Sequence, residues 1–341
     1  MEEEVRQHLV VVVGASRGLG RALALELVRD LDAPSGSVEP QRQEDRPPVR
    51  PHVRVVLAAR DAAGLASTAA AINKQHGQLH QLQHPGVAPR VLEVDLGAAS
   101  EDASGREGAV AAVTAAVQAG VAEAQERGHA WRVVVVYAAG AHEPASVRDD
   151  DAEGAPCWRY SRADDWSSEE VARWWRVNVG SAVALLSRLQ GGLGLAGQGS
   201  PQPQQQGRLV FVYLSSQAAE ERWWPQGNAL YGPQKREAEV QLASTASATD
   251  TTLLCVRYPF VATEMADKLF AELLPVDAGL HADPTDITSP PLAREQVFLP
   301  LAKAAADTAA LISAQPSKAG ALHAPFRLVE PQVFSYEPAR Q

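Results

Sequence analysis

The stretch VVVVGASRGLGRALALELV, residues 10–28, joins an apolar run to a helix-like pattern through a turn with three glycines. These are Gly14, Gly18 and Gly20, and Ser16 and Arg17 lie between them. Anions favour a helix N-terminus, where unpaired N–H groups and the helix dipole point outward, but a phosphate comes close only where side chains are absent. The stretch therefore predicts a strand, a phosphate-binding turn and a helix, in that order.

The glycine spacing is G-x-x-x-G-x-G, which differs in both gaps from the dinucleotide-binding fingerprint G-x-G-x-x-G. The turn still follows a strand and opens a helix, as that fingerprint requires. A glycine-rich turn of purely structural use is the alternative, and the motif by itself leaves both interpretations open.

Short apolar runs rich in β-branched residues alternate with Ala- and Leu-rich stretches of helical character along the chain. The apolar runs are residues 9–13, 53–57, 91–94, 133–137, 209–214 and 253–256, with a further candidate at 321–328. The helical stretches include residues 19–31, 109–124, 171–189 and 234–246. Continuous apolar strands are typical of a parallel sheet covered on both faces, so we expect an α/β, doubly wound, Rossmann-type fold.

Three connecting stretches, residues 33–51, 145–157 and 191–207, are rich in Pro, Gln, Gly or acidic residues and offer little that could pack. We expect them to be surface insertions in one domain that spans residues 1–341.

The composition favours a small-molecule partner. The chain has 45% hydrophobic and 21% charged residues, as ordinary globular proteins do, and a net charge of −10. That charge argues against binding to nucleic acid or to an anionic membrane, because neutralising phosphates requires a basic face. The two cysteines, Cys157 and Cys255, have no Cys or His nearby at metal-ligand spacing, which predicts neither a disulfide framework nor a metal site.

Two features of the sequence predict a cytoplasmic protein. No apolar run reaches the roughly 20 residues of a membrane span. The acidic start MEEEVRQ lacks the basic region of a secretory signal.

The second predicted strand ends in VVLAAR, where Arg60 precedes Asp61. An NAD site is expected to carry an acidic residue at this strand end, to bind the ribose 2′-hydroxyl. Arg60 and Arg17 instead suit a 2′-phosphate, because the planar guanidinium forms paired, charge-assisted hydrogen bonds with phosphate oxygens. The alternative is that both arginines are solvated surface residues.

The segment NALYGPQKREAEV holds the only Y-x-x-x-K of the chain, Tyr231 and Lys235. Four residues are about one helical turn, so both side chains lie on one helix face. A nearby ammonium favours the phenolate and brings the tyrosine pKa down from about 10 towards neutral pH, where the phenol can exchange a proton. An exposed i,i+4 pair is the alternative interpretation.

Ser215 and Ser216 end the preceding strand, RLVFVYLSS. Ligand sites of parallel sheets lie outside the carboxyl ends of the strands, so a hydroxyl there could donate to a substrate carbonyl oxygen. A polar strand end or a helix cap is the alternative for either serine.

The sequence resembles the short-chain dehydrogenase/reductase family over nearly its whole length outside the expected insertions. The resemblance rests on the ordered segments VVVGASRGLGRAL, VLAARD, VLEVDLG, VVVVYAAGA, RVNVGS, LVFVYLSSQ, YGPQK and VRYPFVATEM. Within the family the chain looks most like the sepiapterin reductases, through GASRGLGR, LAAR, DLG and a C-terminal KAGALH after a helix.

This resemblance implies a mostly seven-stranded parallel sheet, NADPH as cofactor, reduction of a carbonyl substrate, with a pterin as the first candidate, and a homodimer formed through the helices that carry Asn178 and Tyr231. The implied cofactor-binding residues are Gly14, Ser16, Arg17, Gly18, Leu19, Gly20, Arg60, Asp95, Leu96, Ala139, Gly140, Tyr231, Lys235 and Thr263.

Each group of residues has an implied role. The glycine turn would meet the diphosphate and adenosine ribose, Arg17 and Arg60 the 2′-phosphate, Asp95 and Leu96 the adenine, and Ala139 and Gly140 the adenosine ribose. The implied catalytic residues are Ser216, Tyr231, Lys235 and Asn178. Ser216 would orient the substrate carbonyl, Tyr231 would donate the proton, Lys235 would bind the nicotinamide ribose, and Asn178 would support a relay water beside the lysine.

Two departures from the family pattern affect the strand ends. The family motif NNAG reads YAAG here, with Tyr137 and Ala138 in place of the asparagines, which removes polar support at that strand end. Ser216 and Tyr231 are two residues further apart than usual, so the loop over the substrate must differ in shape.

Two further departures affect the ligands. The family's PG reads Pro259-Phe260 and is one residue short before Thr263, which puts the binding of the nicotinamide amide in doubt. The aspartate that anchors a pterin ring falls on or near Ala324, and unpaired pterin donors would cost roughly 1 to 3 kcal/mol each.

Three functions remain open at this point. The first is an NADPH-dependent reductase that acts on the side-chain ketone of a pterin. The second is a broad carbonyl reductase in which Trp223, Trp224 and Phe260 form an apolar wall, although loop packing explains these aromatic residues equally well. The third is an NADPH-binding sensor or scaffold with weak catalysis.

Overall fold

The computed structural model describes residues 7–32, 52–79, 88–98, 106–141, 167–195, 207–220, 230–249, 251–258, 261, 263, 299–314 and 326–329. The expected insertions at 33–51 and 145–157 lie outside these residues, as does most of the one at 191–207. The following residues singled out above also lie outside them: Cys157, Trp223, Trp224, Pro259, Phe260 and Ala324.

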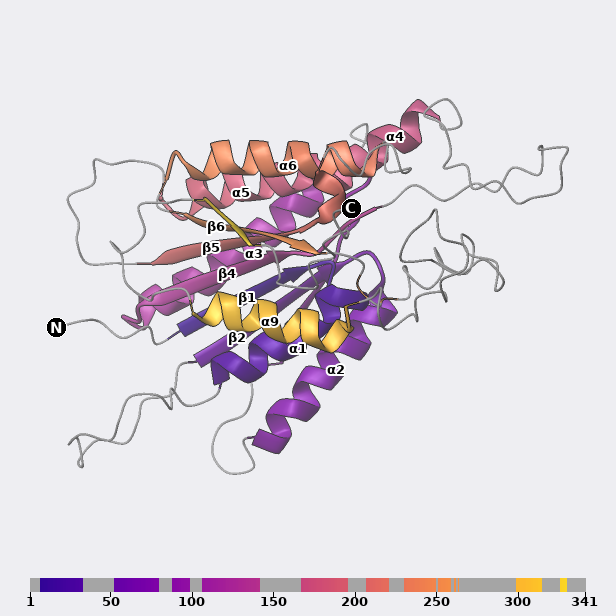
Figure 1. Ribbon diagram of the computed structural model, residues 1–341. Coiled ribbons are helices and arrows are strands. Elements are labelled where there is room, and N and C mark those ends of the chain that lie inside the picture. Colours follow the sequence, from indigo (N-terminus) through magenta and orange to yellow (C-terminus); the bar gives the residue numbers. More distant parts are fainter. Residues whose placement is uncertain are drawn as a thin grey trace, which may run out of the picture.

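Seven parallel strands form one sheet in the order β3-β2-β1-β4-β5-β6-β7 (Figure 1). The strands are β1 (Gln7–Val13), β2 (His52–Ala59), β3 (Arg90–Glu93), β4 (Trp131–Tyr137), β5 (Arg208–Ser216), β6 (Thr252–Tyr258) and β7 (Phe326–Val329). The chain winds outward in one direction from β1 and in the other from β4, so the order reverses between these two strands. This doubly wound arrangement confirms the predicted fold, and ligands bind at such a reversal point.

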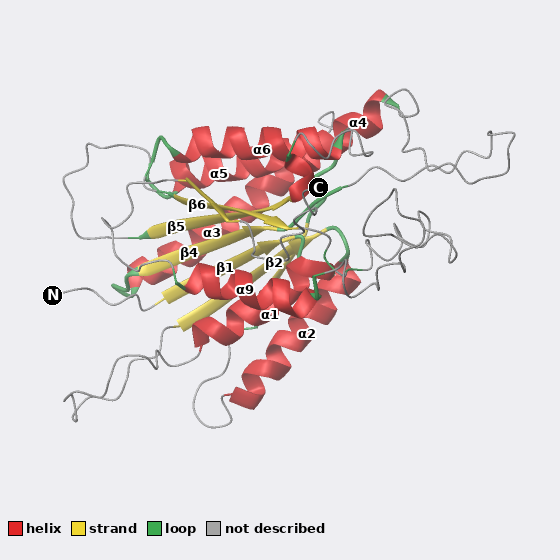
Figure 2. Cartoon of the chain, in the orientation of Figure 1, coloured by secondary structure: helices red, strands yellow, loops and turns green. Residues whose placement is uncertain are grey.

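Helices cover both faces of the sheet (Figure 2). One layer holds α1 (Gly18–Asp32), α2 (Ala62–Leu79) and α9 (Leu301–Ser313). The other layer holds α3 (Arg106–Glu126), α5 (Ser181–Gly192) and α6 (Tyr231–Ala246). A shorter helix, α4 (Ser168–Trp175), leads through a π-helical turn, η2 (Arg176–Gly180), into α5.

The core consists of two apolar layers separated by the sheet. In β1, Val11 and Val13 pack into the layer under α3 and α5, whereas Val10 and Val12 pack into the layer under α1 and α9. All four are fully buried, which explains why this strand reads as an unbroken run of valines. Each such side chain contributes roughly 1.5 to 3 kcal/mol through burial.

The structure extends and divides the predicted elements. Strand β5 runs from Arg208 to Ser216, beyond its apolar segment, because polar residues at its two ends still pair with the neighbouring strands. The helical stretch predicted at 171–189 is interrupted by η2. The helical stretches named above did not include α2, an Ala-rich helix in which Leu65 and Ile72 face the core. The helix expected before KAGALH is α9.

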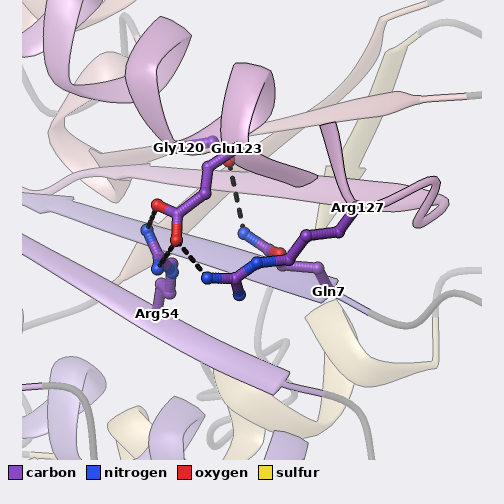
Figure 3. Close-up of polar contacts among 5 residues, drawn as sticks. All are labelled: Gln7, Arg54, Gly120, Glu123 and Arg127. Carbon is purple, nitrogen blue, oxygen red and sulfur yellow. Dashed lines mark hydrogen bonds and ion pairs between the residues drawn. The ribbon is translucent and has the colours of Figure 1, made fainter. Parts of the chain in front are cut away.

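Charged side chains tie helices to the sheet at the amino ends of the strands. Arg54 of β2 forms a bidentate ion pair with Glu123 of α3, which also pairs with Arg127, and Gln7 donates to the Gly120 carbonyl at 3.2 Å (Figure 3). On the other face, Arg132 of β4 donates to the Ile312 carbonyl near the C-terminus of α9 at 2.7 Å.

None of the described helices combines the length and apolarity needed to cross a bilayer. Within the same residues, His, Cys, Asp and Glu side chains form no group of three or more that could hold a metal ion.

Candidate active site

The glycine turn between β1 and α1 is closely packed at two of its three glycines. A Cβ at Gly14, whose φ is +90°, would lie 2.6 Å from the Ala139 nitrogen, and a Cβ at Gly20 would lie 2.3 Å from the Gly14 oxygen. Close packing alone therefore requires glycine at these two positions, since any side chain would push β4 or α1 away from the turn.

Gly18 is different, because among the described residues a Cβ there would meet only Thr263 Cγ2, at 3.9 Å. Its φ is +55°, it begins α1, and Leu19 follows it half-buried. The first N–H groups of a helix lack intrahelical partners and carry the positive end of its dipole. Within the part of the chain that the structure describes, the turn thus presents a helix N-terminus with little side-chain cover, which suits a phosphate.

Helix α2 supports this turn from below. Thr68 Oγ1 donates to the Ala15 carbonyl at 3.0 Å, and Ser16 is buried against Gly64. Arg17, next in the chain, is exposed, as is Arg60, which directly follows β2. Because β1 and β2 are adjacent parallel strands, both arginines stand at the carboxyl edge of the sheet, where a 2′-phosphate beside the turn would meet them.

Side chains from α4 and α5 hold the turn after β3 in place. Asp95 accepts from the Gly97 N–H at 2.9 Å and lies 3.6 Å from Arg173 Nη2 of α4. The Leu96 carbonyl accepts from Ser181 Oγ at 3.1 Å. Asp95 is half-buried and Leu96 is buried, so they form a firm, partly apolar wall of the kind an adenine ring requires.

The end of β4 carries a polar contact that the sequence did not suggest. The Tyr137 hydroxyl donates to the Val177 carbonyl at 2.6 Å, so the tyrosine in YAAG supplies a polar tie at the strand end where asparagine support was expected to be lost. Ala139 is half-buried and Gly140 exposed. A Cβ at Gly140 would lie 3.8 Å from both Asn178 Oδ1 and Lys235 Nζ, which brings these three residues together.

Asn178 lies in η2, fully buried, and connects two parts of the site. Its Oδ1 accepts from the Ala141 N–H at 3.0 Å, and its Nδ2 donates to the Ala141 carbonyl and to Gln234 Oε1, each at 2.7 Å. The main-chain oxygen of Asn178 accepts from the Tyr213 hydroxyl at 2.8 Å. The π-helical turn displaces carbonyls from the regular helical pattern, and hydroxyls from β4 and β5 satisfy two of them.

Tyr231 and Lys235 occupy the first turn of α6, as the Y-x-x-x-K spacing predicts. Lys235 is only 2% exposed, which excludes the exposed-pair interpretation for the lysine. Its Nζ donates to the Leu214 carbonyl at 3.0 Å and lies 4.7 Å from the ring centroid of Tyr213 and 5.5 Å from that of Tyr231. Tyr231 itself is half-buried.

The environment of Lys235 lowers the pKa of its ammonium group. Burial lowers the pKa of its ammonium from 10.5 to about 8, and the negative charge of Glu239, followed by the influence of Cys255, acts in the opposite direction. A cation that stays charged at neutral pH although it is buried beside a phenol is the arrangement that lowers a tyrosine pKa.

Ser216 caps a short 3-10 helix, η3 (Gln217–Ala219), by accepting from the Ala218 N–H at 3.1 Å. The helix-cap interpretation therefore holds, and it leaves the hydroxyl hydrogen for donation, because a serine hydroxyl both accepts and donates. η3 packs against α6, so Ser216 and Tyr231 come from segments in direct contact. Ser215 is buried, and its Oγ has no hydrogen-bond partner within the described residues.

Sequence reasoning missed several residues that build this site. They are Thr68, Tyr213, Gln234, Glu239 and Arg257, whose Nε donates to Glu239 Oε1 at 2.9 Å. Two sequence patterns could have indicated some of these residues. VVVVY and VFVY place Tyr137 and Tyr213 at matching positions of adjacent strands. TLLCVRY places the charged Arg257 inside an apolar strand.

The sequence matches no protein-family model and no curated protein sequence. The structure is nevertheless similar to many solved structures. L-sorbose reductase from Gluconobacter frateurii, complexed with NADPH and L-sorbose, is 17% identical with a TM-score of 0.56, and the match covers 97% of each chain.

Two more structures are similar at the same level. An alcohol dehydrogenase from the archaeon Thermococcus sibiricus, complexed with 5-hydroxy-NADP, is 17% identical with a TM-score of 0.55, covering 95% of this chain and 96% of that one. An NADPH-bound carbonyl reductase from chicken fatty liver is 15% identical with a TM-score of 0.50, covering 88% of each chain. At these identities the likeness establishes the fold over nearly the whole chain.

Proposed function

We propose that the protein is an NADPH-dependent carbonyl reductase of the short-chain dehydrogenase/reductase type. The observation that carries the proposal is the buried ammonium of Lys235 beside the Tyr231 ring, at the same sheet edge as the glycine turn. Proteins of similar fold bind NADPH or a derivative of NADP and include an L-sorbose reductase and a carbonyl reductase, which supports the same chemistry here.

The residues present fit a dinucleotide phosphate. The α1 N-terminus with the open position at Gly18 suits the diphosphate, Arg17 and Arg60 suit a 2′-phosphate, and Asp95 and Leu96 suit the adenine. We assign Ala139 and Gly140 to the adenosine ribose and Lys235 to the nicotinamide ribose, as the sequence resemblance implies. When bound, NADPH supplies the hydride that reduces the carbonyl carbon.

The chain's own residues handle the charge that develops on the carbonyl oxygen. The Ser216 hydroxyl donates to that oxygen, and Tyr231 delivers the proton to it. The Lys235 ammonium stabilises the phenolate that remains on Tyr231, and Asn178 fixes the backbone at Ala141 and the side chain of Gln234 on α6. Stabilising the oxygen where its charge grows lowers the barrier to reduction.

For the substrate we propose the side-chain ketone of a pterin, on the strength of the sequence resemblance. The departure near Ala324 favours the alternative, a broad carbonyl reductase that acts on non-pterin ketones. A sensor or scaffold that binds NADPH without catalysis is the third candidate. Against it stands the buried contact network of Asn178 and Lys235, which orders side chains that a scaffold has no need to order.

One substrate screen separates these functions. NADPH consumption is compared with NADH consumption, using sepiapterin, simple diketones and no substrate. We expect oxidation of NADPH in preference to NADH. Turnover of sepiapterin supports the pterin substrate, and turnover of diketones alone supports the broad reductase.

The matched variant for this screen is Tyr231→Phe, which removes only the hydroxyl. It should bind NADPH as the parent protein does but lose nearly all turnover, because the proton donor is gone. NADPH binding without turnover of any carbonyl, unchanged by Tyr231→Phe, would instead establish the sensor.

We also propose a homodimer formed through the helices that carry Asn178 and Tyr231, in a cytoplasmic protein. Val240 of α6 is 52% exposed and Trp175 of α4 is 41% exposed, which supplies apolar surface for such a contact. Gel filtration that shows only a monomer at micromolar concentration would remove the dimer from this proposal.

A further inference from the structure

A buried ion pair lies one helical turn beyond Lys235. Arg257 of β6 donates from Nε to Glu239 Oε1 at 2.9 Å and from Nη2 to Glu239 Oε2 at 2.6 Å. The side chains of Glu239 and Arg257 are only 2% and 6% exposed. This bidentate geometry fixes both side chains in one orientation.

Arg257 also reaches the segment that follows Ser216. Its Nη1 lies 3.7 Å from Glu220 Oε1, and Glu220 is the C-cap residue of η3. In the sheet, Arg257 stands opposite Ser215. Arg257 therefore connects the helix of Tyr231 to the strand end of Ser216.

Glu239 and Lys235 share one face of α6, since they are four residues apart and both are buried. The other groups that face Lys235 are the rings of Tyr213 and Tyr231 and the thiol of Cys255, with Asn178 Oδ1 close by. Among the described groups around Lys235, Glu239 is the buried carboxylate. At the rim, Arg236 Nη1 lies 3.8 Å from Glu239 Oε2 and is more than half exposed.

Stability alone does not explain such a pair. Taking two charges out of water costs several kcal/mol per ion, and well-packed apolar residues often stabilise a fold as well or better. A buried carboxylate one turn from a buried ammonium has a second effect, because its field favours the protonated form of that ammonium.

We propose that Glu239 and Arg257 are positioning residues for the reduction: Glu239 keeps Lys235 protonated beside Tyr231, and Arg257 holds Glu239 and Glu220 so that α6 and the Ser216 segment keep a fixed separation. This inference rests on the proposed function for its purpose. The charge coupling can be tested without any turnover.

The test is a pH titration of tyrosinate absorbance in the cofactor-free protein, in which the difference from the Tyr231→Phe form of each variant isolates Tyr231. Glu239→Gln removes a negative charge that favours the protonated forms of both Lys235 and Tyr231 and leaves Arg257 positive, so the tyrosinate midpoint, which belongs to this coupled pair, should fall by roughly 0.5 unit or more. Arg257→Met removes the positive charge and should raise the midpoint by a similar amount. The double variant should return it close to the parent value.

Matched controls separate charge from packing. Glu237→Gln makes the same chemical change on the same helix, at a half-buried carboxylate that accepts from Gln241, and should leave the midpoint unchanged. In Glu220→Gln, Glu239 and Arg257 remain paired with each other. We therefore expect this variant to fold even if Glu239→Gln or Arg257→Met does not. It should lower the midpoint by a smaller amount in the same direction as Glu239→Gln.

Steady-state kinetics provide a second measurement. The alkaline limb of kcat/KM for carbonyl reduction should move in the same direction as the Tyr231 midpoint in each variant. Equal shifts in all variants, or lower rates with an unmoved midpoint and an unmoved limb, would overturn the positioning role. If Glu239→Gln and Arg257→Met shift the midpoint in opposite directions but the protein reduces no carbonyl, the charge coupling would be supported and the proposed function would be refuted.

Discussion

The two edges of the sheet use charged side chains in opposite ways. At the amino edge, Arg54 forms a partly exposed ion pair with Glu123 (Figure 3). Arg132 donates to the C-terminal end of α9, so each of these charges fastens a helix to the sheet. At the carboxyl edge, Lys235 donates to the Leu214 carbonyl and is buried beside tyrosine rings.

This difference shows how a function can be located in a fold that many unrelated activities share. A charge that fastens a helix should affect stability without affecting chemistry. A charge that is buried at a cost, at the edge where ligands bind, should affect chemistry without supporting stability. The following predictions test this contrast, from the largest expected effect to the smallest.

Lys235→Met should lower kcat for carbonyl reduction by roughly 100- to 10,000-fold, because the phenolate of Tyr231 loses its neighbouring cation. The free energy of unfolding in urea should stay the same or rise, since the variant no longer buries an ammonium. Arg132→Met is the comparison at the other edge, and it should lose stability while keeping kcat. A fall in stability for Lys235→Met with kcat preserved would reverse the contrast.

The pH dependence of the reduction follows from the same residue. Burial lowers the pKa of Lys235 to about 8, so the ammonium is present below that pH and is lost above it in the cofactor-free protein. We expect kcat/KM to fall as the pH rises through this range, with a midpoint that belongs to the coupled pair of Tyr231 and Lys235. A rate that stays flat up to pH 10 would contradict a role for the ammonium.

Gly20→Ala should disturb the turn, because the new Cβ would lie 2.3 Å from the Gly14 oxygen. We expect it to cost about 1 to 3 kcal/mol of unfolding free energy and to weaken NADPH binding measured by cofactor fluorescence. Gly108→Ala in α3 is the matched control, since a Cβ there meets none of the described residues within 4 Å. The control should be neutral or stabilising by up to about 1 kcal/mol and should bind NADPH normally.

Much of the fold could be predicted from the sequence, for a physical reason. Strands buried on both faces must be continuously apolar, so VVVV in β1 and VVVV in β4 were readable without a structure. The local spacing of Tyr231 and Lys235 was readable too, because one helical turn fixes their common face.

The parts of the site that escaped prediction depend on contacts between distant segments. Glu239 meets Arg257 across 18 residues, and Tyr213 meets the Asn178 carbonyl across 35. The π-helical turn at Asn178 left no signal in RVNVG, because its altered carbonyls are satisfied by tyrosines from other strands. Such pairings depend on sheet order and register, which single-segment patterns do not contain.

At the amino edge, His8 should make stability depend on pH. Burial, and then the nearby charge of Arg132, lowers the pKa of His8 from 6.5 to about 4, so the native state holds it neutral while the unfolded chain binds a proton. The free energy of unfolding should therefore decrease by up to about 1.4 kcal/mol per pH unit as the pH falls from about 6.5 to about 4. Urea unfolding of His8→Gln across this window should show a shallower slope, and an unchanged slope would show that His8 is not the group responsible.

The smallest effect belongs to the ion pair of Arg54 and Glu123, whose side chains are 20% and 32% exposed. A double-mutant cycle with Arg54→Gln and Glu123→Gln should give a coupling of about 1 kcal/mol or less, because water and salt screen a partly exposed pair. The hydrogen bond from Arg54 lowers the pKa of Glu123, so the coupling is present above the ordinary glutamate pKa and is lost as acid protonates the carboxylate. Both variants should keep the parent kcat. A change in the kcat pH profile would mean that charge at the amino edge reaches the catalytic residues through the sheet, and the division between fastening and catalytic charges would then fail.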